Sequence, residues 1–167
     1  MPNRSLTTGT LGFNVQASYV SIRGFAIVNF LNPGANGIGL FGSSSSCEIY
    51  GNNIGVDETG TVDRGNAQYG IWVDAGASGN LVGTNADGTN DADERNLVGG
   101  NDIGILIRGN GNRFYGNKVG TDHTGTVAIP NNNGIWIDGA TSNLIGTNAP
   151  AARNLLSGNV YNGVLIG

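Results

Sequence analysis

The sequence predicts an all-β solenoid of stacked three-strand coils, and three observations support this fold class. Glycine accounts for 30 of 167 residues while charged residues make up only 12%, which favours many short strands and turns over a helical bundle. Apolar residues alternate with period 2 in short segments, as they do in half-buried strands. Longer strings of residues recur along the chain in a fixed order, which is typical of repeat architectures.

The internal repeat is a unit of roughly 60 to 65 residues that occurs twice. Its first string, YGNNIGVDETGTV at 50–62, returns as YGNKVGTDHTGTV at 115–127. The next two strings follow in the same order: ASGNLVGTN at 77–85 returns as ATSNLIGTN at 140–148, and RNLVGGN at 95–101 returns as RNLLSGN at 153–159. One structural unit has therefore been used twice in succession.

Each unit contains short strands of three types. The third type reads Gly-Ile-x-Ile or a close variant, and it starts at residues 37, 70, 104, 134 and 163, which are 29 to 34 residues apart. Two other strand types lie between these, for example at 47–50 and 53–56, and at 112–115 and 118–121. Three strands per turn, repeated in this way, predict about five coils of a parallel β-helix.

The apolar positions of the third strands predict the core. Alternate side chains of a strand point to opposite faces, so every second residue faces inward. Coils stacked at the strand spacing of about 4.8 Å would bury these residues as continuous columns. The first column is Ile38, Ile71, Ile105, Ile135 and Val164, and the second is Leu40, Val73, Ile107, Ile137 and Ile166.

Asparagines and glycines mark the corners between strands. Gly-Asn recurs at 51–52, 100–101, 116–117 and 158–159, and both residue types tolerate the left-handed backbone of a sharp turn. Asn80, Asn112 and Asn143 recur at another corner. We expect their amides to stack and to form hydrogen bonds from one coil to the next.

The strings GTDHTGTV, RNLLSGN and GIWIDGATSNLIG resemble the repeats of right-handed parallel β-helix proteins of the pectin-lyase-like superfamily, in the form found in large exported bacterial repeat proteins. The resemblance extends from about residue 12 to the end of the chain. It implies one single-stranded β-helix domain over residues 1–167 and an extracellular or cell-surface location. It implies no particular activity, because the superfamily contains lyases, hydrolases, epimerases, adhesins and stalks.

Charge and hydropathy exclude two classes of partner. The net charge is −4, and the eight Lys and Arg residues are scattered, so no basic surface for nucleic acid is expected. No apolar stretch approaches the ~18 residues of a membrane-spanning helix. Neither end reads as an amphipathic capping helix, which predicts a fragment of a longer solenoid or a module with possible end-to-end self-association.

The outward positions of the third strands carry the candidate contact residues. Trp72 and Trp136 are predicted on one external face, two coils apart, beside a second row formed by Asp74, Arg108 and Asp138. An indole can cover the face of a sugar ring while charged groups bind its hydroxyls, which makes Trp72, Trp136, Asp74 and Asp138 a candidate carbohydrate site. Two alternatives are that long loops cover the indoles, or that they form a protein interface.

The same row permits an enzymatic interpretation through the family resemblance. In similar polysaccharide lyases, carboxylates bind Ca²⁺ and a basic residue removes the proton α to a uronate. Arg108 would then be the base, and Asp74 and Asp138 would hold metal or substrate. Against this, a guanidinium between two carboxylates is ordinarily a surface ion-pair ladder that keeps both acids ionised.

The loop GTNADGTNDADE at 83–94 predicts a possible Ca²⁺ site. Compared with the EF-hand pattern, it supplies Asn85, Asp87, Gly88, Asp91 and Glu94 at ligand or turn positions, although Gly83 replaces the first aspartate. The alternative is a solvated acidic turn, since the equivalent loop GTNAPAAR at 146–153 has no acids.

The repeated Asp-x-Thr-Gly-Thr loops predict turns stabilised by their own side chains. Asp57 and Asp122 each precede Thr-Gly, a pattern that favours Asx and Ser/Thr turns, and His123 is expected in an exposed loop. The sequence thus favours a non-catalytic β-helix module that is structural or contacts a carbohydrate or partner. The alternative is a polysaccharide-active enzyme, lyase-like or glycosidase-like, that uses the outer face of the third strands.

Overall fold

A computed structural model describes residues 10–167 and contains three parallel sheets wound as a solenoid of about five turns. Sheet A follows the order β1 (Leu11–Val15), β4 (Asn36–Leu40), β7 (Tyr69–Val73), β10 (Ile103–Ile107), β13 (Asn133–Ile137) and β16 (Asn162–Ile166). Sheet B contains β2 (Ser21–Arg23), β5 (Glu48–Tyr50), β8 (Leu81–Gly83), β11 (Arg113–Tyr115) and β14 (Leu144–Ile145). Sheet C contains β3 (Ala26–Ile27), β6 (Asn53–Ile54), β9 (Leu97–Val98), β12 (Lys118–Val119) and β15 (Leu155–Leu156).

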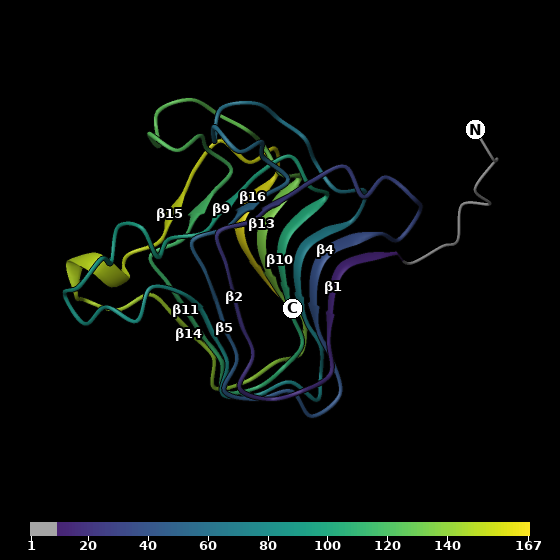
Figure 1. Cartoon of the computed structure of the whole chain (residues 1–167), viewed down its shortest axis with the longest axis vertical. Coiled ribbons are helices and arrows are strands. Elements are labelled where there is room, and N and C mark those ends of the chain that lie inside the picture. The colour runs from purple at the N-terminus through teal and green to yellow at the C-terminus, as the bar shows by residue number, and fades with distance from the viewer. Residues whose placement is uncertain (1–9) are drawn as a thin grey trace.

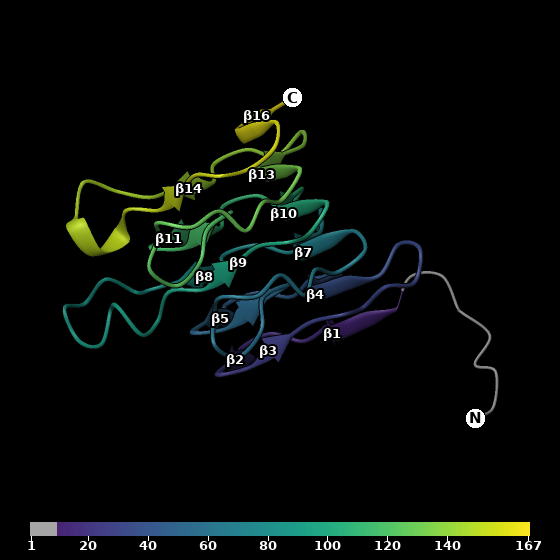
Figure 2. The ribbon, with the colours of Figure 1, turned by 90° about the horizontal axis from the view of Figure 1, so that it is seen from above.

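The coils are layered in chain order, from β1 to β16 (Figure 2). In the view of Figure 1, turned by 90° from that of Figure 2, the three sheets form the walls of the solenoid around its interior. The predicted parallel β-helix of about five coils is confirmed, and the third strands start one residue earlier than the Gly-Ile pattern suggests. Within residues 10–167, no helix is long and apolar enough to cross a membrane.

Both predicted core columns are confirmed in strict register. Ile38 pairs with Ile71, Ile71 with Ile105 and Ile105 with Ile135, and these four side chains are fully buried. The second column runs through Leu40, Val73, Ile107, Ile137 and Ile166 in the same register, but the predicted burial is not reached in the last strand, where Val164 of the first column and Ile166 of the second are exposed. Columns of this kind give every inner coil an apolar neighbour above and below, so burial is continuous along the axis.

Asparagine ladders occupy three corners of the solenoid. In each ladder, the backbone N–H and the side-chain Nδ2 of one asparagine generally donate to the Oδ1 of the asparagine in the next coil, as Asn80 does to Asn112 at 2.9 and 3.0 Å. This confirms the stacked amides expected at Asn80, Asn112 and Asn143. The other two ladders are Asn52, Asn96, Asn117 and Asn154, and Asn66, Asn101, Asn131 and Asn159.

The ladders satisfy polar groups that the tight corners would otherwise bury without partners. The inner asparagines of all three ladders are almost fully buried, so each amide has to form its hydrogen bonds within the protein. Their Nδ2 groups also donate to backbone carbonyls, as Asn101 does to Ile54 of the preceding coil and to Gly99 of its own corner. The ladders therefore fix both the corner conformation and the stacking register.

At each of two corners of the solenoid, a long loop occurs in every second coil. This alternation explains why the repeat unit comprises two coils. The loops between β8 and β9 and between β14 and β15 project on one side, and the second of them carries the 3₁₀ turn η1 (Pro150–Ala152) (Figures 1 and 2). The loops after β6 and β12 project at another corner (Figure 1). There, a small second cluster of Val56, Leu97 and Ile129 packs beneath them.

Candidate contact face on sheet A

The outer face of sheet A brings the predicted contact residues into two adjacent rows, one with the tryptophans and one, two residues further along, with the charged residues. Trp72 pairs in register with Leu106, and Leu106 with Trp136, so the two indoles stand two strands apart as expected. Neither indole belongs to the interior core cluster. Gly39 precedes this row and Leu165 follows it.

Trp72 is packed into an aromatic group rather than standing free. Its ring meets Phe41 edge to face, with centroids 4.9 Å apart, and meets Tyr69 at 5.5 Å in the same geometry. Phe41 reaches over Gly39, where a Cβ atom would lie only 2.1 Å from the Phe41 ring. The Trp72 Nε1–H is buried and has no hydrogen-bond partner in the described part of the chain. Trp72 is therefore held rigidly, with an unused donor.

Leu106 departs from the expectation of an open external row, because it is fully buried on the outer face. It lies in register between the two tryptophans and is not part of the interior cluster. Its burial shows that side chains on this face cover one another. Trp136 remains half-buried, and no aromatic ring contact involves it among residues 10–167.

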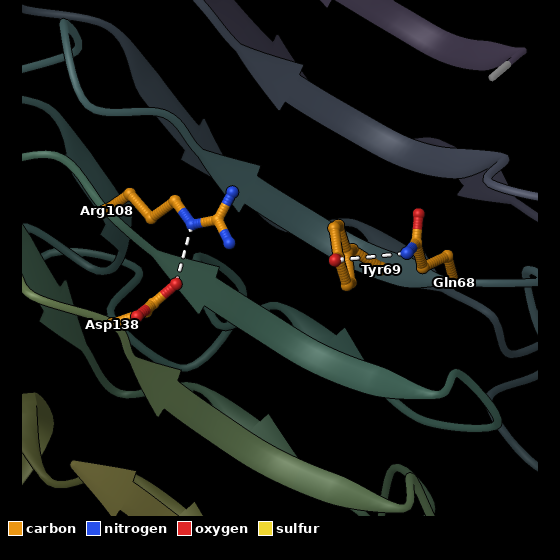
Figure 3. Close-up of polar contacts among 4 residues, drawn as sticks. All are labelled: Gln68, Tyr69, Arg108 and Asp138. Carbon is orange, nitrogen blue, oxygen red and sulfur yellow. Dashed lines mark hydrogen bonds and ion pairs between the residues drawn. The ribbon is translucent and has the colours of Figure 1, made fainter. Parts of the chain in front are cut away.

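Arg108 and Asp138 form an ion pair at the end of the row. Arg108 Nε donates to Asp138 Oδ2 at 2.8 Å, as Figure 3 shows, and the two side chains are 41% and 33% exposed. The Arg108 guanidinium also lies over the Trp72 ring, 6.0 Å from its centroid. On the same face, Gln68 Nε2 donates to Tyr69 Oη at 3.1 Å (Figure 3). Of the predicted ladder of Asp74, Arg108 and Asp138, only the second step is an ion pair.

The electrostatics of this pair bear on the enzymatic interpretation. The hydrogen bond from Arg108 to Asp138 raises the pKa of the guanidinium above its ordinary value, desolvation opposes this rise, and the charges of Asp138, Tyr69 and Asp74 add to it. A raised pKa makes Arg108 a poorer proton acceptor. The arrangement suits binding of polar groups better than abstraction of a proton.

The acidic loop predicted to bind Ca²⁺ is held by its own hydrogen bonds. Thr84 Oγ1 lies 2.8 Å from Asp91 Oδ1 and 2.9 Å from Glu94 Oε2. Backbone amides supply further donors: Asn85 N donates to Glu94, Gly88 N to Asp91, and Thr89 N to Asp87. Among residues 10–167, no group of three or more His, Cys, Asp or Glu side chains is arranged to hold a metal ion. Calcium binding by this loop stays a prediction.

The two Asp-x-Thr-Gly-Thr loops form the self-bonded turns that the sequence predicts. Asp122 accepts hydrogen bonds from the Thr124 hydroxyl and from the backbone N–H groups of Gly125, Thr126 and Val127. Desolvation alone would raise the pKa of Asp122, but these hydrogen bonds outweigh it and lower the pKa to about 2. The carboxylates of these turns therefore act structurally.

The equivalent carboxylate in the first unit behaves in the same way. The pKa of Asp57 is lowered chiefly by the hydrogen bond from Val62 N, against desolvation, with further donors from Thr59 and Thr61. His123 is exposed, as predicted, and its backbone N–H donates to Gly60 O of the first-unit loop. The two turns therefore stack on each other across the intervening coil.

Comparisons with known proteins identify no matching family model, no matching curated protein and no matching solved structure. The assignment of the chain to the parallel β-solenoids therefore rests on its sheets, core columns and asparagine ladders.

Proposed function

We propose that this chain is a non-catalytic module of an exported or surface protein of the pectin-lyase-like β-helix type, and that the outer row of sheet A contacts carbohydrate. One observation carries the proposal. Two indoles stand in a single register row on an outer face, next to a paired guanidinium and carboxylate. Aromatic surface beside fixed polar groups is the combination that binds sugar rings.

Rigidity of the face supports this role. The edge-to-face contacts of Trp72 with Phe41 and Tyr69 fix its ring before any ligand arrives, which lowers the entropy lost on binding. The Arg108–Asp138 pair holds donors and acceptors at the rim of the row. The half-buried Trp136 supplies the second apolar surface.

The non-catalytic interpretation is supported by the state of the charged residues. Arg108, the base of the lyase alternative, is paired with Asp138 and has a raised pKa. The aspartates of the repeated loops are committed to turn hydrogen bonds. These contacts give Arg108, Asp138 and the two loop aspartates structural roles, which supports binding over catalysis as the role of the outer face.

A glycan-binding experiment tests the proposal directly. Neutral and acidic polysaccharides are titrated into the chain while tryptophan fluorescence and binding heat are recorded. Binding that Trp136→Ala weakens at least about tenfold is expected, because the variant removes one stacking surface. Tyr19→Ala is the matched control, since Tyr19 is 84% exposed and lies outside sheet A.

The same titrations distinguish the alternatives. Absorbance of unsaturated uronate products that disappears in Arg108→Gln would establish the lyase interpretation and overturn the proposal. Binding that is unchanged in both Trp72→Ala and Trp136→Ala would place the glycan elsewhere. The absence of any glycan binding would refute the carbohydrate role and leave a protein partner for this face.

The proposal also assigns Ca²⁺ to the acidic loop at 83–94. Asn85, Asp87, Asp91 and Glu94 supply hard oxygen ligands within one turn, which bends at Gly88 with φ of +88°. A Ca²⁺ titration should raise the unfolding temperature of the chain and leave that of Glu94→Gln unchanged. Mg²⁺ at equal concentration is the control, and equal responses to both ions would contradict a specific site.

A further inference from the structure

The two ends of the solenoid differ in how well they cover the core. At the end formed by β1, β2 and β3, the inward residues Val15, Ile22 and Ile27 are only 3 to 6% exposed. There the rings of Phe13 and Phe25 meet edge to face at 5.1 Å. At the end formed by β14, β15 and β16, the inward residues of β16 are open to solvent.

The end formed by β14, β15 and β16 presents an apolar hollow bordered by unpaired strand edges. Val164 is 41% exposed although its register partner Ile135 is fully buried, and Ile166, which pairs with the half-buried Ile137, is 74% exposed. A hollow of about 610 Å³ lies over this end and is lined largely by apolar side chains, including Ile145 and Leu156. In the described part of the chain, β14, β15 and β16 are each paired on one side only.

The asparagine ladders show which kind of neighbour fits. The hydrogen bonds of every ladder point toward the C-terminus: the backbone N–H of a corner residue donates to the Oδ1 of the asparagine one coil later. At the open end the ladders stop at Asn143, Asn154 and Asn159. The backbone N–H groups of these three residues have no acceptor among residues 10–167. A neighbour that excludes water from this end has to supply three acceptors for them.

At the other end, the first coil of the described residues does not carry those acceptors. In this coil, Phe25 and Phe30 hold the ladder positions and donate their backbone N–H groups to Asn52 and Asn66. Val20 stands at the third corner, one residue before the start of β2. A second copy stacked head to tail would therefore cover the apolar end and leave three amide N–H groups buried without partners, which is unfavourable.

We propose that the C-terminal end of this solenoid is a docking surface for one further β-solenoid coil that carries asparagine at all three corners. The apolar hollow takes the inward side chains of that coil, its strands extend the three sheets, and its Oδ1 atoms accept from Asn143, Asn154 and Asn159. The occupant is thus a coil of the same type as β14–β16, and a second copy of this chain does not fit. The proposal does not depend on glycan binding at sheet A.

Extension of the full chain by one coil tests the proposal. Gly167 occupies the register position of Asp138, so a second copy of residues 139–167 appended after Gly167 supplies a coil with the three asparagines. Hydrogen exchange of the backbone amides of Asn143, Asn154 and Asn159 is measured in the extended and wild-type chains. We expect these amides to become about tenfold or more better protected, together with a higher unfolding temperature.

Two matched extensions separate the ladder from simple apolar cover. In the first, the appended copies of Asn143, Asn154 and Asn159 are replaced by alanine. In the second, residues 17–41 are appended, so that the coil with Val20, Phe25 and Phe30 follows Gly167. Neither should protect the three amides as the asparagine coil does. Equal protection by either extension, or an appended asparagine coil that proteases remove as an unfolded tail, would overturn the proposal.

The oligomeric state of the wild-type chain is a second, independent test of the proposal. The end-to-end association that open edges favour stays a prediction, and the ladder mismatch argues against its head-to-tail form. Sedimentation of the wild-type chain over a range of concentrations should show a monomer. Assemblies that Ile166→Lys disrupts would make a second copy the occupant and overturn the proposal, and Phe25→Lys would then show whether the second copy docks through its N-terminal end.

Discussion

The interior of sheet A and its outer face follow different rules, although alternate residues of the same strands form them. Every coil places a large apolar residue in the interior column, from Phe13 to Val164. The outer row varies from glycine at 39 to tryptophan at 72 and 136. The interior is a similar enclosed space in each of the inner coils, whereas the outer face has no such constraint. Positions that repeat from coil to coil therefore indicate the fold, and positions that vary between coils indicate features specific to this protein.

The largest loss of unfolding free energy is expected when a core residue of β10 is truncated, and its neighbour on the outer face provides the comparison. Ile105→Ala should destabilise the chain by about 4 kcal/mol, because the surrounding columns cannot collapse into the cavity. Leu106→Ala should cost about 2 kcal/mol, because the side chains that cover it on the outer face can move toward the gap. Chemical denaturation of both variants measures the difference. A greater loss for Leu106→Ala would show that the outer face is the more tightly packed layer.

The next effect concerns the ladders. Asn101→Ala removes the acceptor for Asn66 and the donor to Asn131 in a buried corner, so we expect a loss of about 3 kcal/mol in unfolding free energy. Asn132→Ala is the control, since Asn132 is exposed and bonds only to exposed Asp102 through its side chain. Comparable losses in the two variants would contradict a special role for the ladder.

A pH-dependent effect is expected at the stacked turns. The folded-state pKa of Asp122 is about 2, below its ordinary value of 3.8, so its contribution to stability is present above that value and is lost as the pH falls from about 4 to 2. Asp122→Asn should lower the unfolding temperature at pH 7, and its difference from wild type should narrow toward pH 2. Glu58→Gln, in the equivalent loop, should keep the wild-type profile. A difference that is constant with pH would refute this role of the carboxylate.

The smallest effect is expected at the ion pair on the outer face. Asp138→Asn should change the unfolding free energy by about 0.5 kcal/mol or less, because both partners are exposed and screened by solvent. The change should shrink further in 1 M salt, where the screening length falls to about 3 Å. A loss comparable to that of Asn101→Ala would mean that the outer face contributes to folding as strongly as the corners do.

The sequence was sufficient to predict the regular part of the fold. The period-2 pattern located both core columns, and Asn80, Asn112 and Asn143 identified one ladder. It did not show that the Gly-Asn pairs belong to two separate corners, nor that Asn96 and Asn131 continue them. The reason is the uneven loop length: successive rungs at 52, 96 and 117 are separated by 44 and then 21 residues, so register in space is hidden along the chain.

The outer face was predictable only in part. The register of Trp72, Trp136, Arg108 and Asp138 followed from the repeat, and the structure confirmed it. The packing of Tyr69 against Trp72 was not predicted, because Tyr69 lies outside the Gly-Ile pattern that located the strands. The full burial of Leu106 depends on which side chains surround it on the surface, and strand alternation does not contain that information.

The direction of the ladders also sets an order of events during synthesis. The chain leaves the ribosome from its N-terminus, so each new coil lacks corner acceptors until the next coil has been made. Addition of that coil supplies acceptors at corners already in place, as Asn112 does for Asn80 and Asn131 for Asn101. In folding that proceeds from the N-terminus, the corner amides of each coil gain their partners only when the following coil forms.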